Sequence, residues 1–214
     1  MNTDLLRQLT TRSDPVERFY GVVVGIVTNN QDPENMHRVK VQFPWLDGST
    51  ESHWARVATP MAGKKRGLYF LPEVDDEVLV AFEHGSIDSP YVIGSLWNGK
   101  DTPPESNSDH QNNNRALHSR SGHIIRFVDK SGGESIEIID KTGSNKIVVN
   151  SKDNTITISS QSDISIKSAN GKVKIEGMGI ELKSQTDVKI QASTNVDAQA
   201  SAIMTLKGSM IKIN

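Results

Sequence analysis

An eight-residue repeat runs through the C-terminal part of the chain and constrains the fold more than any other feature. Pairs of apolar residues separated by one residue, usually polar, begin at Ile156, Ile164, Val173, Ile180, Val188, Val196, Met204 and Ile211, so their spacing averages close to eight. Residues two apart on a β-strand lie on the same face. Each repeat, here called an octad, therefore predicts a short strand with two inward side chains, followed by a polar turn.

A single ribbon of octads cannot bury enough apolar surface to stay ordered. Ordering a residue's backbone costs about 1–2 kcal/mol, and two half-buried aliphatic side chains per octad do not offset eight ordered residues. Two arrangements supply partners: a single-chain solenoid, or three identical chains wound around one axis as a triangular prism. Three octads per solenoid turn leave fewer than three turns, so the trimer is favoured. The residues predicted to fill its interior are Ile156, Ile158, Ile164, Ile166, Val173, Ile175, Ile180, Leu182, Val188, Ile190, Met204, Leu206, Ile211 and Ile213.

Composition changes abruptly along the chain. Ten of the eleven aromatic residues lie at or before Trp97, the last is Phe127, and all eight prolines lie at or before Pro104. Strands paired on both sides need every backbone N–H, which excludes proline, and a thin interior has no room for large rings. Both absences agree with a narrow prism in the C-terminal part.

The N-terminal half shows a different β pattern. Segments rich in Val, Ile, Phe, Tyr and Trp alternate with Gly, Pro, Asn and Asp, and in residues 37–44 Val39, Val41 and Phe43 alternate with polar residues. The predicted strands are 19–28, 37–44, 53–60, 77–84 and 90–97. Five strands in about 80 residues favour a small five-stranded barrel of the OB type.

The chain is thus predicted to be all-β, with an OB-fold barrel followed by a triple-stranded β-helix. Residues 98–114 contain almost nothing to bury and include Pro103 and Pro104, which indicates a linker. Further strands are predicted at 122–129, 134–140 and 145–150. The predicted organisation is an N-terminal segment (1–18), a barrel (19–98), a linker or neck (99–118) and a needle (119–214).

Composition excludes several classes of protein. The chain has no cysteine and a net charge of −2, which excludes disulfides and argues against a general nucleic-acid binder. It has no apolar run long enough to cross a bilayer and no secretory signal at its start. The six histidines show no metal-ligand spacing, so no metal or cofactor is expected. Asp75, Asp76 and Glu77 fit an acidic turn, and Lys64, Lys65 and Arg66 fit a solvated loop better than a phosphate site. No catalytic motif is present, so an enzyme is not expected.

Two parts of the sequence resemble a known family. The sequence resembles the central spike of contractile injection machines in its barrel segments, residues 19–46, 53–85 and 90–104, and in a second match at residues 119–147. The range 90–104 contains GSLWNG followed by Pro103-Pro104. The spike proteins that it resembles are the phage baseplate assembly protein V family and the spike half of the valine-glycine-repeat protein of type VI secretion. The resemblance implies a homotrimeric spike that docks on a hub protein through its OB domains and pierces the target membrane with its needle.

The resemblance also implies partner proteins, and this sequence differs from some members of the family at its two ends. A separate PAAR-repeat protein would cap a flat tip formed by Met210, Ile211, Ile213 and Asn214, because the last histidine is His123 and no His-x-His metal tip is present. The segment before the barrel is too short for a hub domain, so a separate hub protein is expected, contacted by Leu5, Leu6 and Leu9. Inner-tube and baseplate components would be indirect partners. The chain is expected to assemble in the cytoplasm and to become part of a virion-like particle or of a secreted or membrane-anchored injection particle.

Two other functions remain open from the residues alone. The barrel could bind nucleic acid or glycan on a trimeric stalk, although its low basicity speaks against this. A single-chain β-helix could act on polysaccharide, although the acidic residues within the octads are scattered.

Overall fold

A computed structural model describes residues 18–46 and 50–213. The described chain consists of two compact units: one ends at Ser159 and holds a barrel and a sheet, and the other comprises residues 160–213. Each is described by itself. The predicted hub contacts Leu5, Leu6 and Leu9, and the tip residue Asn214, lie outside the described residues.

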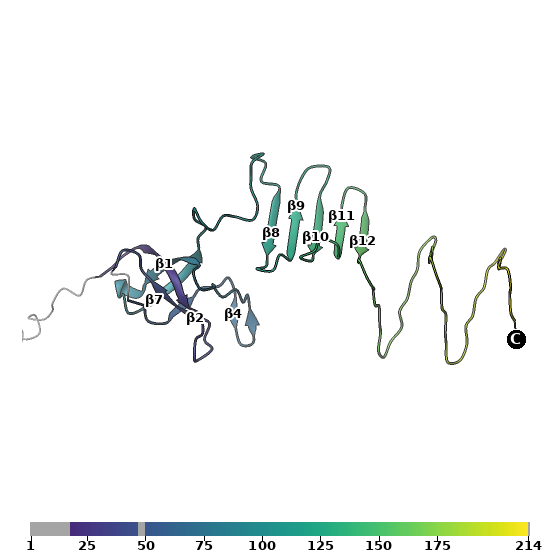
Figure 1. The fold of residues 1–214 in the computed structure, drawn as a ribbon, viewed down its shortest axis with the longest axis horizontal. Coiled ribbons are helices and arrows are strands. Elements are labelled where there is room, and N and C mark those ends of the chain that lie inside the picture. Colours follow the sequence, from purple (N-terminus) through teal and green to yellow (C-terminus); the bar gives the residue numbers. More distant parts are fainter. Residues whose placement is uncertain (1–17, 47–49, 214) are drawn as a thin grey trace, which may run out of the picture. The chain divides into compact units, whose positions relative to one another are not determined.

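Five strands close into a barrel (Figure 1). They are β1 (Val22–Asn29), β2 (Arg38–Gln42), β3 (Ala55–Val57), β6 (Glu77–Phe82) and β7 (Pro90–Ser95), arranged in the order β1-β2-β3-β7-β6. Only β3 and β7 pair in parallel. Every predicted strand of the barrel is present, and the predicted five-stranded barrel is confirmed.

Alternation along the strands builds the barrel core. Val39 and Val41 on β2, and Val78 and Val80 on β6, are fully buried, whereas their neighbours along the strand are only partly buried. Phe43 follows β2, and its ring lies 5.5 Å from that of Phe82. Side chains two apart on a strand share a face, so this pattern places one row of each strand inside the barrel.

Two short elements interrupt the barrel sequence. A hairpin of β4 (Ala62–Gly63) and β5 (Arg66–Gly67) lies between β3 and β6 and forms a sheet of its own. A single 3₁₀ turn (Glu83–Gly85) lies between β6 and β7. The sequence patterns did not predict the hairpin, because its strands are too short to show a periodicity.

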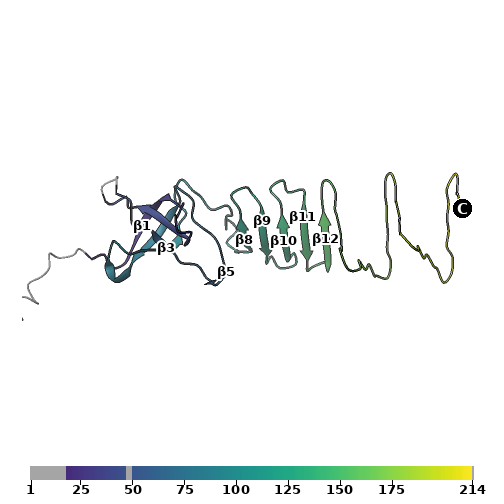
Figure 2. The ribbon, with the colours of Figure 1, turned by 90° about the horizontal axis from the view of Figure 1, so that it is seen from below.

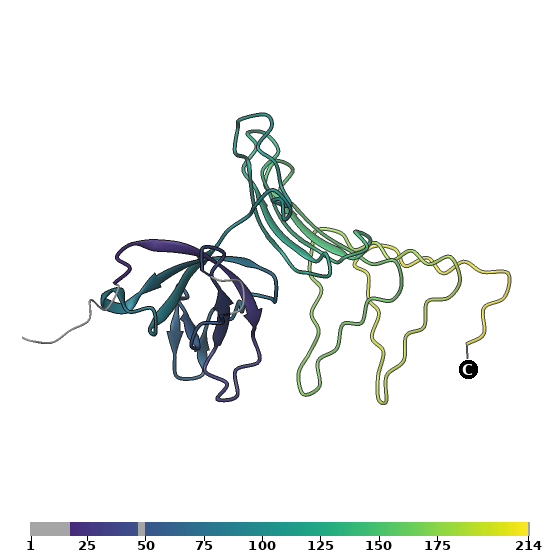
Figure 3. The same ribbon diagram turned by 60° about the vertical axis from the view of Figure 1, so that its left-hand side comes forward.

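A five-stranded antiparallel sheet follows the barrel in the sequence. It contains β8 (Asn114–His118), β9 (Ile124–Val128), β10 (Ser135–Ile139), β11 (Lys146–Asn150) and β12 (Thr155–Ser159), each paired with the next (Figures 1 and 3). The three strands predicted between 122 and 150 are present. Strand β8 lies in the segment predicted as linker, 99–118, and was not expected from the sequence.

Residues 160–213 form no strand within the single chain, and all of them except the half-buried Ser160 are exposed. The backbone runs back and forth in extended segments (Figure 2). It bends at residues 161–162, 169–171, 177–178, 185–186, 193–194, 201–202 and 209, so the bends recur about every eight residues and the octad repeat is present in the backbone. These residues do not close into a solenoid within one chain.

Candidate oligomerisation surface

One face of the β8–β12 sheet is apolar and uncovered. The strand register aligns Leu117, Ile125, Ile138, Ile147 and Ile158 in one row across all five strands. A second row on the same face contains Phe127, Ile136, Val149 and Ile156. We call these nine residues the apolar sheet face.

The apolar sheet face is open to solvent in the single chain. The exposed fractions of eight of these side chains run from 39% for Ile147 to 72% for Ile156, and Val149 is partly buried. Continuous apolar surface of this kind is rare on a monomeric soluble protein and marks a contact surface. A sheet with one bare apolar face also lacks the second layer that a stable domain needs.

The opposite face of the sheet is mainly polar at its centre. Arg126 on β9 faces Glu137 on β10, in a row that continues to Ala116 and Val148. Because successive side chains point to opposite faces, the same alternation that exposes the isoleucines places this ion pair on the other side.

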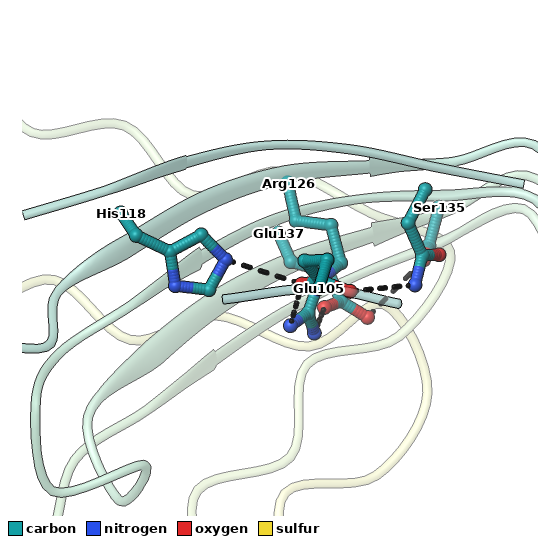
Figure 4. A network of polar contacts seen from close by, with 6 residues as sticks. Glu105, His118, Arg126, Ser135 and Glu137 are labelled. Carbon is teal, nitrogen blue, oxygen red and sulfur yellow. Dashed lines mark hydrogen bonds and ion pairs between the residues drawn. The ribbon is translucent and has the colours of Figure 1, made fainter. Parts of the chain in front are cut away.

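Glu105 covers this polar face and is the centre of its polar network (Figure 4). Its Oε1 accepts hydrogen bonds from Arg126 Nη2 at 2.7 Å and Nε at 3.1 Å, and lies 3.1 Å from His118 Nε2. Its Oε2 accepts one from Asn114 Nδ2 at 3.0 Å. Arg126 Nη1 donates to Glu137 Oε2 at 3.3 Å. We call this set the Glu105 clamp, since it ties the segment preceding β8 to the sheet.

The clamp shifts the acidity of its members. The Arg126 guanidinium holds the pKa of Glu105 below its ordinary value, the hydrogen bonds from Asn114 and His118 act in the same direction, and partial burial opposes them. The pKa of Arg126 is raised, chiefly by its hydrogen bond to Glu105. The carboxylate and the guanidinium therefore both remain charged near neutral pH.

The octads carry apolar side chains that are equally uncovered. The predicted interior residues from Ile164 to Leu206 have exposed fractions from 49% for Met204 to 72% for Leu182. Ile211 and Ile213, at 51% and 87%, and Met210 of the predicted tip are exposed as well. Their assignment to a trimer interior and to a tip stays a prediction, because the structure contains one chain.

The sequence analysis missed the part of the surface that precedes Ile156. The two rows that contain Ile156 and Ile158 also contain seven earlier residues: Leu117, Ile125, Phe127, Ile136, Ile138, Ile147 and Val149. The pairs Ile125/Phe127, Ile136/Ile138 and Ile147/Val149 show the same apolar-x-apolar signal as the octads, at longer intervals of 11, 11 and 9 residues up to Ile156. Extending the pattern search to unequal intervals finds them.

The histidines and the acidic residues Asp75, Asp76 and Glu77 form no metal site in the part of the chain that the structure describes. Within residues 18–46 and 50–213, no three His, Asp or Glu side chains come close enough together to hold a metal ion. Asp76 Oδ2 accepts a hydrogen bond from the Glu73 backbone N–H, and Asp75 has a positive φ of 77°, so the acidic cluster is a turn before β6.

In the part of the chain with assigned structure, no helix has the length and apolar character required to cross a membrane.

The described chain combines a closed five-stranded barrel, a sheet with one bare apolar face and an octad repeat in its backbone. Known proteins resemble parts of this chain. Residues 23–97 match the family described as the type VI secretion system/phage-baseplate injector OB domain. The resemblance to the baseplate and type VI spike family is confirmed by this match and by the similar proteins described next.

Several similar proteins are spike proteins of type VI secretion systems. VgrG3 of Vibrio cholerae serotype O1 is 33% identical over 126 residues, which cover 53% of this chain and 12% of the relative. VgrG1b of Pseudomonas aeruginosa is 34% identical over 142 residues, 60% of this chain and 19% of the relative. VgrG5 of the same organism is 38% identical over 100 residues, 42% of this chain and 12% of the relative. The matches span less than a fifth of the length of these relatives.

Proposed function

We propose that the chain is the homotrimeric central spike of a contractile injection machine, a phage tail, a tailocin or a related particle. Its OB barrels dock on a hub protein, and its C-terminal part forms a triple-stranded β-helical needle that pierces the target envelope. The observation that carries this proposal is the uncovered apolar surface of β8–β12 and the octads, in a chain whose relatives are spike proteins.

The apolar surface requires partners that are matched to it along its whole length. Residues 160–213 form no paired strand within one chain, so ordering each of them costs about 1–2 kcal/mol without compensating hydrogen bonds. Two further copies supply both a shared interior and strand edges, since identical chains carry identical repeats. Two inward side chains per octad suit one narrow face of a prism with three faces.

Such a prism resists bending because every strand would be held by hydrogen bonds to neighbouring chains. Sheath contraction acts along the axis of the particle, and a thin structure without free edges transmits that force without unfolding. The wider barrels spread the force over the hub. This role needs no catalytic group, and we propose that the protein is not an enzyme and binds neither cofactor nor nucleic acid.

The remaining partners are proposed from the same role. Exposed Met210, Ile211 and Ile213 support an apolar platform for a PAAR-repeat tip protein, together with Asn214. Leu5, Leu6 and Leu9 are proposed to contact the hub, and inner-tube and baseplate components would interact indirectly. We propose assembly in the cytoplasm, with the target membrane contacted only on firing.

The native mass of the full chain tests the trimer. One chain has a mass of 23.5 kDa, so a trimer has 3 × 23.5, or about 70.5 kDa. We expect this mass by sedimentation at equilibrium, and SDS-resistant trimers on a gel. A folded monomer at low concentration contradicts the proposal.

Two matched double variants test the interior. Ile164→Asp with Ile190→Asp places two charges on the predicted interior, where an unpaired charge is strongly destabilising, and should abolish SDS-resistant trimers. Ser165→Asp with Gln191→Asp introduces the same two carboxylates one residue away, on the alternate face, and should leave the trimers intact. Equal behaviour of the two variants overturns the assignment of the interior.

A further inference from the structure

A groove beside the barrel combines cations that lack a carboxylate partner with exposed apolar side chains; one of these cations, Arg56, lies 5.6 Å from the centre of the Tyr91 ring. It has a volume of about 510 Å³ and lies between the β4–β5 hairpin and the turn before β2. Arg56, Lys65 and Arg66 line it, and no acidic residue does. None of the three forms an ion pair with a carboxylate of residues 18–46 or 50–213. We call this the hairpin groove.

The apolar part of the hairpin groove is exposed. Met36 and Met61 line the groove and are at least half exposed, and Tyr69 is 76% exposed. Methionine adapts its shape to varied partners, and tyrosine and arginine are enriched where proteins bind one another. The groove thus offers a contact surface for a side chain of moderate size between positive charges.

The half-buried imidazole of His37 lies at the groove without a hydrogen-bond partner among the described residues. Both ring nitrogens of His37 are buried and make no hydrogen bond, although buried polar groups are almost always paired. The Tyr69 ring lies against the imidazole, with centroids 4.7 Å apart. A ligand that displaces the exposed Tyr69 ring would reach an unused hydrogen-bonding group.

We propose that the hairpin groove binds an acidic segment of another protein, in which carboxylates flank an apolar side chain. Carboxylates pair with arginine and lysine through charge-assisted hydrogen bonds, and the apolar side chain fits against the two methionines. This inference does not require the proposed trimer, because every residue of the groove belongs to one chain.

The charge of the barrel favours a peptide over a nucleic acid. Residues 19–98 carry six basic and ten acidic side chains, a net charge of 6 − 10 = −4. Nucleic-acid binding proteins typically neutralise many phosphates along an extended basic surface. Three cations in one small groove of an acidic domain instead complement a few carboxylates close together.

Fluorescence anisotropy with labelled synthetic peptides tests the proposal on the full chain. The probes alternate Asp or Glu with Leu or Phe, and control peptides contain Asn or Gln in place of the acids. We expect acidic peptides to bind, their affinity to fall as salt is raised, and the amide controls to bind at least about tenfold more weakly.

Two neighbouring lysines supply a matched pair of variants. Lys65 lines the groove and Lys64 does not. Lys65→Glu should weaken acidic-peptide binding about tenfold or more, whereas Lys64→Glu, with the same change of charge, should change it about twofold or less. Circular dichroism of both variants verifies that the barrel is folded.

Three results overturn the proposal: no acidic peptide bound at about 1 mM, equal binding of acidic and amide peptides, or equal effects of the two lysine variants. Tighter binding of a single-stranded oligonucleotide that displaces the peptide assigns the groove to nucleic acid instead. None of these results changes the native mass of the protein. A failed peptide-binding proposal can therefore be distinguished from a failed spike proposal.

Discussion

At the scale of single residues, Glu105 is the side chain whose role depends most on the folded structure. It lies in a segment with no strand of its own, yet its carboxylate bonds to residues on β8 and β9. The sequence around it, with two prolines and several serines and asparagines, indicates only a linker. Through this one charged side chain, part of the connecting segment is held against the polar face of the sheet.

Replacing this carboxylate should loosen β8. Glu105→Gln keeps the shape of the side chain but removes its charge, and we expect a local loss of about 1–2 kcal/mol, which speeds amide exchange in residues 114–118 roughly 5- to 30-fold. Asp101→Asn makes the same chemical change earlier in the connecting segment and should leave exchange unchanged. Identical exchange in Glu105→Gln and the wild-type protein would show that the clamp contributes nothing to the order of β8.

The clamp also predicts a dependence on pH. Because the pKa of Glu105 is lowered in the folded protein, its contribution is present above the unfolded value of about 4.3 and is lost as the pH falls through the lower folded value. We expect protection of β8 to decrease over that acidic range in the wild-type protein. The Glu105→Gln variant should show a flatter profile, measured by exchange at matched intrinsic rates.

At the scale of elements, the sheet of β8–β12 pairs its strands within the chain but leaves one apolar face uncovered. Each of its hairpins pairs well within the chain, and the turn from β10 to β11 is closed by Asp140, whose carboxylate accepts hydrogen bonds from Thr142 and from the Asn145 backbone. Those hydrogen bonds lower the pKa of Asp140, Thr142 contributing most. The turns therefore set the register, and the register places all nine apolar side chains on one face.

Truncation on that face distinguishes a free sheet from a covered one. Ile138 is 50% exposed in the single chain, so Ile138→Ala should be nearly neutral in a monomer. In the proposed trimer the side chain is buried, and the same change should cost about 2–5 kcal/mol per chain. Thr157→Ala, on the opposite face, should cost about 0.5 kcal/mol or less.

Denaturant unfolding at fixed protein concentration measures both variants. A large loss for Ile138→Ala together with a small one for Thr157→Ala supports burial of the apolar sheet face. Small losses in both would mean that solvent, and not another chain, covers this face.

At the scale of the whole molecule, stability should grow with the number of octads. Each octad contacts mainly its neighbours in a repeat structure, so the free energy of unfolding is close to a sum over repeats. Chains ending after Lys207, Gln191 and Ile175 lose one, three and five apolar pairs. We expect the temperature at which the trimer dissociates in SDS to fall in that order.

A length-matched control separates repeat loss from chain shortening. A full-length chain in which Ile211 and Ile213 are both replaced by Ser should behave like the chain that ends after Lys207. If dissociation temperatures are equal for all lengths, the octads do not contribute to assembly and the needle proposal is wrong.

Local patterns were sufficient for much of this architecture. Val39, Val41 and Phe43 alternate with polar residues, and the structure buries all three. The apolar pairs recur every eight residues, and the backbone bends with the same period. Strand positions and faces are predictable here because side chains two apart always share a face, whatever the strand pairs with.

Only the tertiary structure decided what depends on residues distant in sequence. Strand β8 and the Glu105 clamp arise because a polar segment finds partners on β9, 21 residues away at Arg126. The hairpin groove joins His37 and Met36 to a hairpin some 25–30 residues later. No short-range periodicity encodes such contacts. The sequence by itself determined which side chains share a face, and the fold determined what each face meets, because burial and pairing are properties of the assembled structure.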